Sequence, residues 1–283
     1  MSDPTAALAE LLAVMARLRD PQHGCAWDLA QSFATIAPYT LEEAYEVLDA
    51  IDSGDPGRLR DELGDLLFQV VFHARMAEER GWFDFAAVAA GICAKLVRRH
   101  PHVFESPAAG ATATPGELSR RWEEQKERER AAAAQRRGDA GGVLVDVPRA
   151  LPALTRASKL GARAARVGFD WPDASQVRAK VREELLELDE VLARAATPSS
   201  AEAAAEEMGD LLFTLVNWSR HLRIDPEAAL RLANGKFERR FNLMERFAAE
   251  RGLTLSALSA AQWDALWCEA KRALQASSLN SIP

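Results

Sequence analysis

Two short acidic segments in the second half of the chain hold the residues best suited to chemistry. They read Glu-Glu-Leu-Leu-Glu at residues 183–187 and Glu-Glu-Met-Gly-Asp at residues 206–210. Both lie in sequence rich in Ala, Leu and Glu, which favours helix. Residues three apart share a helix face, and two such helices packed antiparallel would bring four carboxylates to one point. A hard divalent cation with oxygen ligands would offset their repulsion. The four carboxylates are Glu184, Glu187, Glu207 and Asp210.

The same pattern occurs in the first half of the chain. A single Glu-x-x-Glu is more often a solvated helix surface, because Glu is a good helix former. Here Glu-Glu-Ala-Tyr-Glu at residues 42–46 is followed by Asp-Glu-Leu-Gly-Asp at residues 61–65, and Leu-Leu-Phe comes after both second segments. The repetition favours the metal-site interpretation over the surface one. The corresponding carboxylates are Glu43, Glu46, Glu62 and Asp65.

Basic and aromatic residues repeat in the same order. Lys-x-x-Arg-Arg at residues 95–99 recurs 141 residues later at 236–240, and Trp-x-x-x-Lys at 122–126 recurs 145 residues later at 267–271. Residues 24–28 loosely match residues 168–171. We therefore predict an internal duplication into two tandem helical domains, at 1–135 and 149–283, with a linker at 136–148.

The composition is that of a soluble globular protein. Of its 283 residues 48% are hydrophobic and 27% charged, and the net charge of −7 disfavours nucleic acid polymers as partners. There is no apolar run of membrane length and no signal-peptide pattern at the N-terminus, so we expect a cytoplasmic protein without membrane attachment. Cys25, Cys93 and Cys268 lie far apart and are expected to be buried or half-buried thiols.

The periodicity predicts an all-α fold, because strand signals are nearly absent. Thr40 is a plausible N-cap for one of the acidic helices, which makes capping the alternative role for Glu43. Helices are expected over residues 5–19, 41–52, 58–80, 85–99, 118–134, 152–166, 175–195, 201–222, 226–251 and 259–276.

The type of metal follows from the ligands. A di-iron or di-manganese carboxylate site needs Glu-x-x-His, and none of the five histidines has a Glu three residues before it. His73 and His221 are read as histidines at a helix surface or a helix end. An all-carboxylate site suits Mg²⁺ or Mn²⁺, with phosphate oxygens and water completing the shell.

Nearby basic and aromatic residues suit a nucleotide. Lys236, Arg239 and Arg240 can contact a polyphosphate, although cations near a helix end also suit the helix dipole. Trp171 and Trp267 either stack on a base or belong to the core. Lys180 lies four residues before Glu184 on the same stripe, and the first half has Tyr39 at the matching position. This difference indicates that the two halves are no longer equivalent.

Together these motifs resemble the MazG nucleoside triphosphate pyrophosphohydrolases in their two-domain bacterial form. The resemblance covers essentially the whole chain and includes residues 17–21 (Arg-Leu-Arg-Asp-Pro), 34–40 (Ala-Thr-Ile-Ala-Pro-Tyr-Thr), 98–104 (Arg-Arg-His-Pro-His-Val-Phe), 168–171 (Gly-Phe-Asp-Trp) and 236–241 (Lys-Phe-Glu-Arg-Arg-Phe). Ala26 stands where the family usually has Pro, and no functional consequence is expected.

The resemblance implies a function and a set of roles. The family forms helical dimers and, with Mg²⁺, splits NTPs or dNTPs into monophosphate and pyrophosphate by water attack at the α-phosphorus, a reaction suited to nucleotide-pool house-cleaning; Mn²⁺ is an expected substitute. In the family the second half can carry the hydrolysis alone, so the second domain is expected to be the catalytic one, with Glu183 as an outer-shell base. The other implied catalytic residues are the second-half metal ligands Glu184, Glu187, Glu207 and Asp210, with Glu43, Glu46, Glu62 and Asp65 as the matching ligands. The implied nucleotide-binding residues are Lys180, Lys236, Arg239, Arg240, Trp267, Lys271 and Trp171.

Two other classes of function stay open on the sequence. A nucleotide-sensing module could bind through Mg²⁺ without hydrolysis, and product analysis would separate it from an enzyme. A purely structural helical scaffold would show no Mg²⁺-dependent thermal shift with nucleotide.

Overall fold

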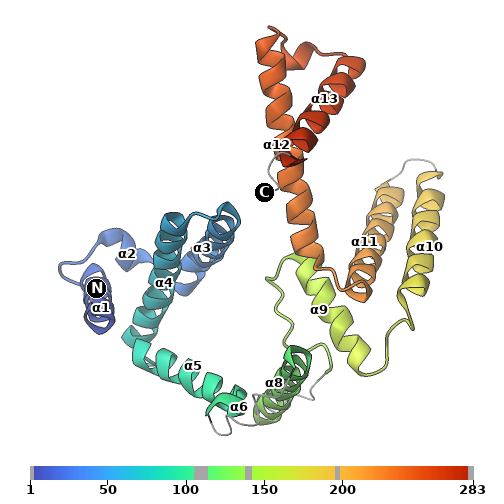
Figure 1. The fold of residues 1–283 in the computed structure, drawn as a ribbon. Helices are drawn as coiled ribbons and strands as arrows, with labels where there is room; N and C mark the ends of the chain where they lie inside the picture. Colours follow the sequence, from blue (N-terminus) through green and yellow to red (C-terminus); the bar gives the residue numbers. More distant parts are fainter. Residues whose placement is uncertain (1–2, 105–113, 138–141, 195–197, 280–283) are drawn as a thin grey trace. The chain divides into compact units, whose positions relative to one another are not determined.

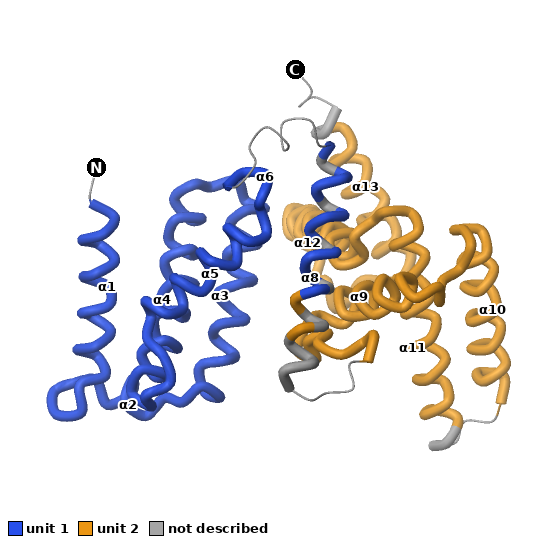
Figure 2. Tube along the Cα trace, turned by 90° about the horizontal axis from the view of Figure 1, so that it is seen from below, with its two compact units in different colours: residues 1–128 blue, residues 129–283 orange. Residues whose placement is uncertain are grey.

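The chain is helical throughout the part that the structure describes. The computed structural model describes residues 3–104, 114–137, 142–194 and 198–279, and every regular element in these ranges is a helix (Figure 1). This confirms the all-α prediction. Within the same ranges, no helix combines the length and the apolar character needed to cross a membrane. The chain divides into two compact units, residues 1–128 and 129–283 (Figure 2). The domain limits expected from the sequence, with a linker at 136–148, stay a prediction.

Unit 1 is built around a pair of long antiparallel helices. A two-residue connection joins α3 to α4: Gly54 ends α3 at a positive φ of 69°, and the Asp55 side chain accepts hydrogen bonds from the first N–H groups of α4. Helices α1 and α5 pack against α4. The described elements are α1 (Pro4–Leu18), α2 (Ala26–Ala30), α3 (Phe33–Ser53), α4 (Pro56–Glu79), α5 (Phe85–Arg99), α6 (Pro101–Phe104) and α8 (Pro115–Arg137), which crosses into unit 2.

Helix α3 begins eight residues earlier than the expected start at Leu41. Ser32 is the N-cap and forms a capping box with Thr35, so the helix is already under way when it reaches Pro38. The prediction that Thr40 is the N-cap was wrong. Thr40 lies in the helix interior, where its hydroxyl is 2.9 Å from Nε2 of His73 on α4. The capping alternative for Glu43 is thereby removed.

The core of unit 1 lies where α1, α3 and α4 meet. Phe72 on α4 is completely buried, and Met15, Ile36 and Val71 pack with it at 1% exposure. At its edge, buried Arg19 forms a bidentate pair with Glu79, whose pKa is lowered mainly by that hydrogen bond. This pair ties the end of α1 to the end of α4.

Unit 2 contains a second pair of antiparallel helices, α10 and α11. Helix α9 packs against both α11 and α12, and α12 packs against α13. One apolar cluster lies between α10 and α11, and another lies between α12 and α13. The described elements are α9 (Ala153–Arg166), α10 (Ala174–Leu192), α11 (Pro198–His221), α12 (Pro226–Glu250), η1 (Leu255–Ala257) and α13 (Ala260–Leu279).

A glycine allows the close approach of α9 to α11. A Cβ placed on Gly161 would lie 2.2 Å from Oδ1 of Asn217, which is 1% exposed and hydrogen-bonded to the carbonyl of Phe213 and to Arg220. We expect Gly161→Ala to lower the free energy of unfolding by about 1–3 kcal/mol, because the buried amide has to shift. Urea unfolding measures this. Gly209→Ala is the control, since its Cβ meets nothing within 4 Å; equal losses in both variants would contradict the argument.

The cysteines depart from the expectation. All three are exposed, and none of them belongs to an apolar cluster of the described residues. The expected linker at 136–148 falls partly outside the described residues.

Candidate metal and nucleotide site

Three carboxylates of unit 2 converge between α10 and α11. Glu184 comes from α10, while Glu207 and Asp210 come from α11, and one oxygen of each lies within 4.8 Å of the others. Glu184 is only 4% exposed. Around Mg²⁺, whose oxygens lie at about 2.1 Å in an octahedron, two ligand oxygens are about 3 to 4.2 Å apart. We call these three side chains the unit 2 trio, or the α10–α11 carboxylates. Small side-chain movements would bring their oxygens to such spacings, so the donor set fits the ion.

The fourth expected ligand of unit 2 lies beside this trio. Glu187 is half-buried, and desolvation raises its pKa. The nearby charge of Lys180 opposes the rise, and Glu184 adds to it. Three of the four predicted ligands are therefore brought together, with Glu187 in the same charge cluster.

Lys180 is held by the acidic residues of its own helix. Its Nζ lies 2.7 Å from Glu183, 3.1 Å from Glu184 and 3.8 Å from Glu187. The contacts with Glu183 and Glu184 raise the pKa of Lys180, the hydrogen bond to Glu183 most. Glu183, expected as an outer-shell base, is exposed on this side of the helix. The sequence placed Lys180 on this stripe but did not reveal its contacts with the carboxylates; its expected contact with a nucleotide stays a prediction.

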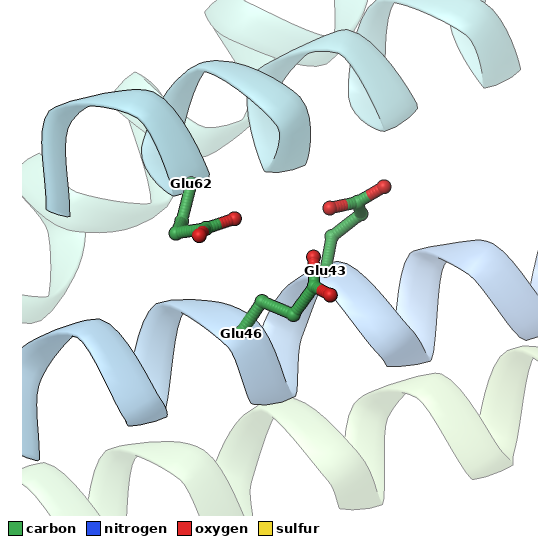
Figure 3. Close-up of side chains that lie close together, drawn as sticks. All are labelled: Glu43, Glu46 and Glu62. Atoms are coloured by element: carbon green, nitrogen blue, oxygen red, sulfur yellow. The ribbon is translucent and has the colours of Figure 1, made fainter. Parts of the chain in front are cut away.

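Unit 1 holds a similar carboxylate trio. Glu43 and Glu46 on α3 point toward Glu62 on α4 across the space between the helices (Figure 3), and their oxygens also lie within 4.8 Å of one another. Desolvation raises the pKa of Glu43 most, with Asp65 the next cause. Asp65 is exposed and lies outside the trio. Arg58 approaches Glu62 at 3.5 Å. Unit 1 thus carries three of its four expected ligands together.

A polar layer, which the sequence did not reveal, continues from this trio along α3 and α4. His73 contacts the Thr40 hydroxyl and stacks on Phe33 with 5.7 Å between ring centroids. Burial lowers the pKa of His73. Gln69, at 4% exposure, lies one turn before His73 on α4. The expectation that His73 is a surface or end histidine was wrong; the four-residue spacing from Asp65 through Gln69 to His73 was the available signal.

The expected nucleotide-binding residues of α12 and α13 lie near one another. The guanidinium carbon of Arg240 is 5.2 Å from the Trp267 ring centroid, and Phe237 packs on the same ring. Trp267 also packs against the α12–α13 core, which is one of its two expected environments; stacking on a base stays a prediction. Lys236, Arg239 and Lys271 are exposed. In the described residues, no hydrogen bond or ion pair joins these four cations to the α10–α11 carboxylates.

The matching residues of unit 1 make the same type of contact. Arg99 lies over the Trp122 ring at 5.5 Å, as Arg240 lies over Trp267. In the repeated motifs, Arg99 corresponds to Arg240 and Trp122 corresponds to Trp267. The contact agrees with an internal duplication, which itself stays a prediction.

The loop that holds Trp171 is fixed to the end of α11. Asp170 accepts hydrogen bonds from Nη1 of Arg220 at 2.9 Å and from its Nη2, and Nε2 of His221 lies 3.0 Å away. These bonds, that of Arg220 first, lower the Asp170 pKa to about 2. We call Asp170 with its partners Arg220 and His221 the Asp170 clamp. Trp171, the next residue, is half-buried. Sequence reasoning missed the partners of Asp170 and read His221 only as a helix-end residue.

The clamp predicts a pH-dependent contribution to stability. Because the folded-state pKa of Asp170 is below its unfolded value of 3.8, the contribution is complete above about pH 5 and disappears as the pH falls toward 2. We expect Asp170→Asn to lower the free energy of unfolding by about 1 kcal/mol at neutral pH, allowing for solvent screening. Urea unfolding of both proteins from pH 7 to pH 2.5 measures the difference. A difference that grows toward low pH would contradict this assignment.

Known proteins share this sequence over most of its length. The model of the MazG nucleotide pyrophosphohydrolase domain matches residues 31–104, which include the unit 1 trio. The chain is 52% identical over 264 residues to the nucleoside triphosphate pyrophosphohydrolase of Escherichia coli K12, covering 93% of this chain and 96% of that protein. It is 41% identical over 262 residues to the nucleoside triphosphate pyrophosphohydrolase/pyrophosphatase MazG of Thermotoga maritima, covering 93% and 94%.

A third relative matches a smaller share. The nucleoside triphosphate pyrophosphohydrolase of Mycolicibacterium smegmatis is 36% identical over 168 residues, which are 59% of this chain and 48% of that protein. The first two matches extend over 93% of this chain. On this identity and coverage, the chain belongs to the MazG family of nucleotide pyrophosphohydrolases, which are hydrolases.

Proposed function

We propose that the chain hydrolyses NTPs and dNTPs to monophosphate and pyrophosphate, with Mg²⁺, by water attack at the α-phosphorus. The observation that carries this proposal is the convergence of Glu184, Glu207 and Asp210 between α10 and α11. The names of two relatives that match over most of the chain, both nucleoside triphosphate pyrophosphohydrolases, support the reaction class. Nucleotide-pool house-cleaning and a cytoplasmic location are part of the same proposal.

In unit 2, the acidic residues would bind the metal and activate water, and the basic residues would bind the phosphates. Mg²⁺, when bound by the trio, would supply positive charge that stabilises the developing charge on phosphate oxygens. Exposed Glu183 is free at its second oxygen to accept a proton from water, since Lys180 occupies the first. Lys236, Arg239 and Arg240 would hold the phosphates, and Trp267 would contact the nucleoside.

We assign hydrolysis to unit 2 on two differences between the trios. Glu184 is buried, while all three carboxylates of the unit 1 trio are half-exposed. Unit 2 also has Lys180 beside its carboxylates, where the sequence of unit 1 has Tyr39, exposed at 42%. The family model matches residues 31–104 of unit 1, so the assignment of hydrolysis to unit 2 rests on these two differences and not on that match. Unit 1 would then have a supporting or nucleotide-selective role.

We also propose that two copies associate as a homodimer. Apolar stripes at helical spacing stay exposed in the single chain: Leu63, Leu67 and Val70 on α4 are 39–49% exposed, and Val88, Ile92 and Leu96 on α5 are 36–48% exposed. Covering such stripes would remove apolar surface from water. Light scattering coupled to gel filtration gives the mass; a single-chain mass of 31.0 kDa at micromolar concentration would contradict the dimer.

Product analysis on a panel of NTPs and dNTPs tests the reaction. With Mg²⁺ we expect monophosphate and pyrophosphate in equal amounts, and neither when the metal is chelated. A nucleotide-sensing module would instead bind the nucleotide and return it intact. Binding without any product would therefore contradict the proposed hydrolysis and support the nucleotide-sensing module.

A further inference from the structure

Lys180 pairs with one of the three carboxylates that a divalent cation would need. Its ammonium is within 4 Å of Glu183, Glu184 and Glu187, and Glu184 is also a member of the trio. The Glu184 side chain is 6% exposed, so water screens its charge poorly and a cation partner is required. In this arrangement that partner is the lysine.

A lysine and a divalent cation on the same carboxylate group oppose each other. Both are positive, and at a few ångströms their repulsion remains substantial in a partly buried site. The Lys180 side chain is long, flexible and 32% exposed, so it can turn toward solvent without disturbing the packing of α10. Once the Lys180 ammonium has left the carboxylates, it needs another anion as its partner.

The triphosphate of a substrate supplies that anion. We propose that Lys180 couples the two ligands of this site: it holds Glu184 when nucleotide is absent and releases this carboxylate to the metal when phosphate binds its ammonium. The inference rests on the proposed function, because it takes the trio as the metal site and a triphosphate as substrate. Linkage then requires that metal strengthens nucleotide binding by the same factor by which nucleotide strengthens metal binding.

The carboxylate trio of unit 1 has no lysine at the position that matches Lys180. Its nearest cation, Arg58, contacts only Glu62 and at 3.5 Å, and Tyr39 stands at the position that matches Lys180. Nothing comparable to the three contacts of Lys180 holds the described carboxylates of the unit 1 trio. The coupling is therefore a property of unit 2.

Direct Mn²⁺ binding to the full chain tests the inference. Paramagnetic resonance of free Mn²⁺ gives the dissociation constant, and the step lost in Glu184→Gln identifies the unit 2 site. Without nucleotide, we expect Lys180→Met to bind Mn²⁺ about tenfold more tightly than the wild type, which corresponds to ~1.4 kcal/mol. A non-cleavable α,β-imido nucleoside triphosphate should then tighten Mn²⁺ binding by a larger factor in the wild type than in Lys180→Met.

Three further proteins keep the test specific. Lys180→Arg retains the charge and should bind Mn²⁺ like the wild type. Arg178→Met removes the same charge from an exposed position on α10 and should also leave Mn²⁺ affinity unchanged. Lys180→Gln repeats the charge removal with a polar side chain, in case Lys180→Met does not fold.

The outcomes separate this inference from the proposed function. If the wild type releases pyrophosphate and Lys180→Met binds Mn²⁺ no more tightly than the wild type, the coupling is wrong and the function stands. If the wild type shows no Glu184-dependent Mn²⁺ binding and no pyrophosphate, both are wrong.

Discussion

Replacing Glu184 with Gln is expected to reduce pyrophosphate release by about 100-fold or more, because it removes one charge from the proposed metal ligands. Gln has nearly the same size and leaves α10 packed against α11. Glu184 is the buried member of the trio, so water cannot replace its carboxylate without rearrangement. Initial rates at saturating Mg²⁺ and nucleotide measure the loss.

Two matched substitutions show whether the loss is specific. Glu190→Gln changes an exposed residue of the same helix and should leave the rate within about twofold, as surface substitutions usually do. Glu43→Gln changes the corresponding carboxylate of unit 1 and should retain most of the activity. If Glu43→Gln abolished pyrophosphate release and Glu184→Gln did not, the assignment of hydrolysis to unit 2 would be wrong.

Phe72→Ala is expected to give the largest loss of stability in unit 1. Phe72 is completely buried between α1, α3 and α4, and truncation removes most of its apolar contacts and leaves a cavity. Such changes cost about 3–5 kcal/mol. Urea unfolding followed by circular dichroism measures the shift of the unit 1 transition.

Phe83→Ala is the control for that experiment. Phe83 belongs to the same unit and undergoes the same truncation, but it is 48% exposed, so we expect a change below about 1 kcal/mol. Similar losses in the two variants would show that Phe72 does not lie at the centre of this core.

Most helices could be predicted because their ends carry local signals. Asp55 before Pro56 and Asp225 before Pro226 combine an N-cap with a proline in the first turn, and both helices begin at those prolines. Helix α3 was misplaced because Pro38 and Thr40 together resemble a helix start. The stronger signal was Ser32 with Thr35, three residues apart.

The carboxylate trios could be predicted because helix periodicity alone decides which side chains share a face. Contacts between distant segments could not be predicted in that way. Asp170 and Arg220 are 50 residues apart and meet only through the packing of the α9–α10 loop on α11. Gly161 is similar, since its importance depends on Asn217, which comes from another helix. The spacing of Lys180 and Glu184 gave their position but not that the two side chains bind each other.

The position of labelled oxygen in the products tests the central claim most directly. The reaction is carried out in ¹⁸O-enriched water with Mg²⁺ and a single nucleotide. The products are then separated, and their masses are measured by mass spectrometry. Water attack at the α-phosphorus predicts one ¹⁸O atom in the nucleoside monophosphate and none in the pyrophosphate. Label in the pyrophosphate, or nucleoside diphosphate with labelled inorganic phosphate, would contradict the proposed reaction.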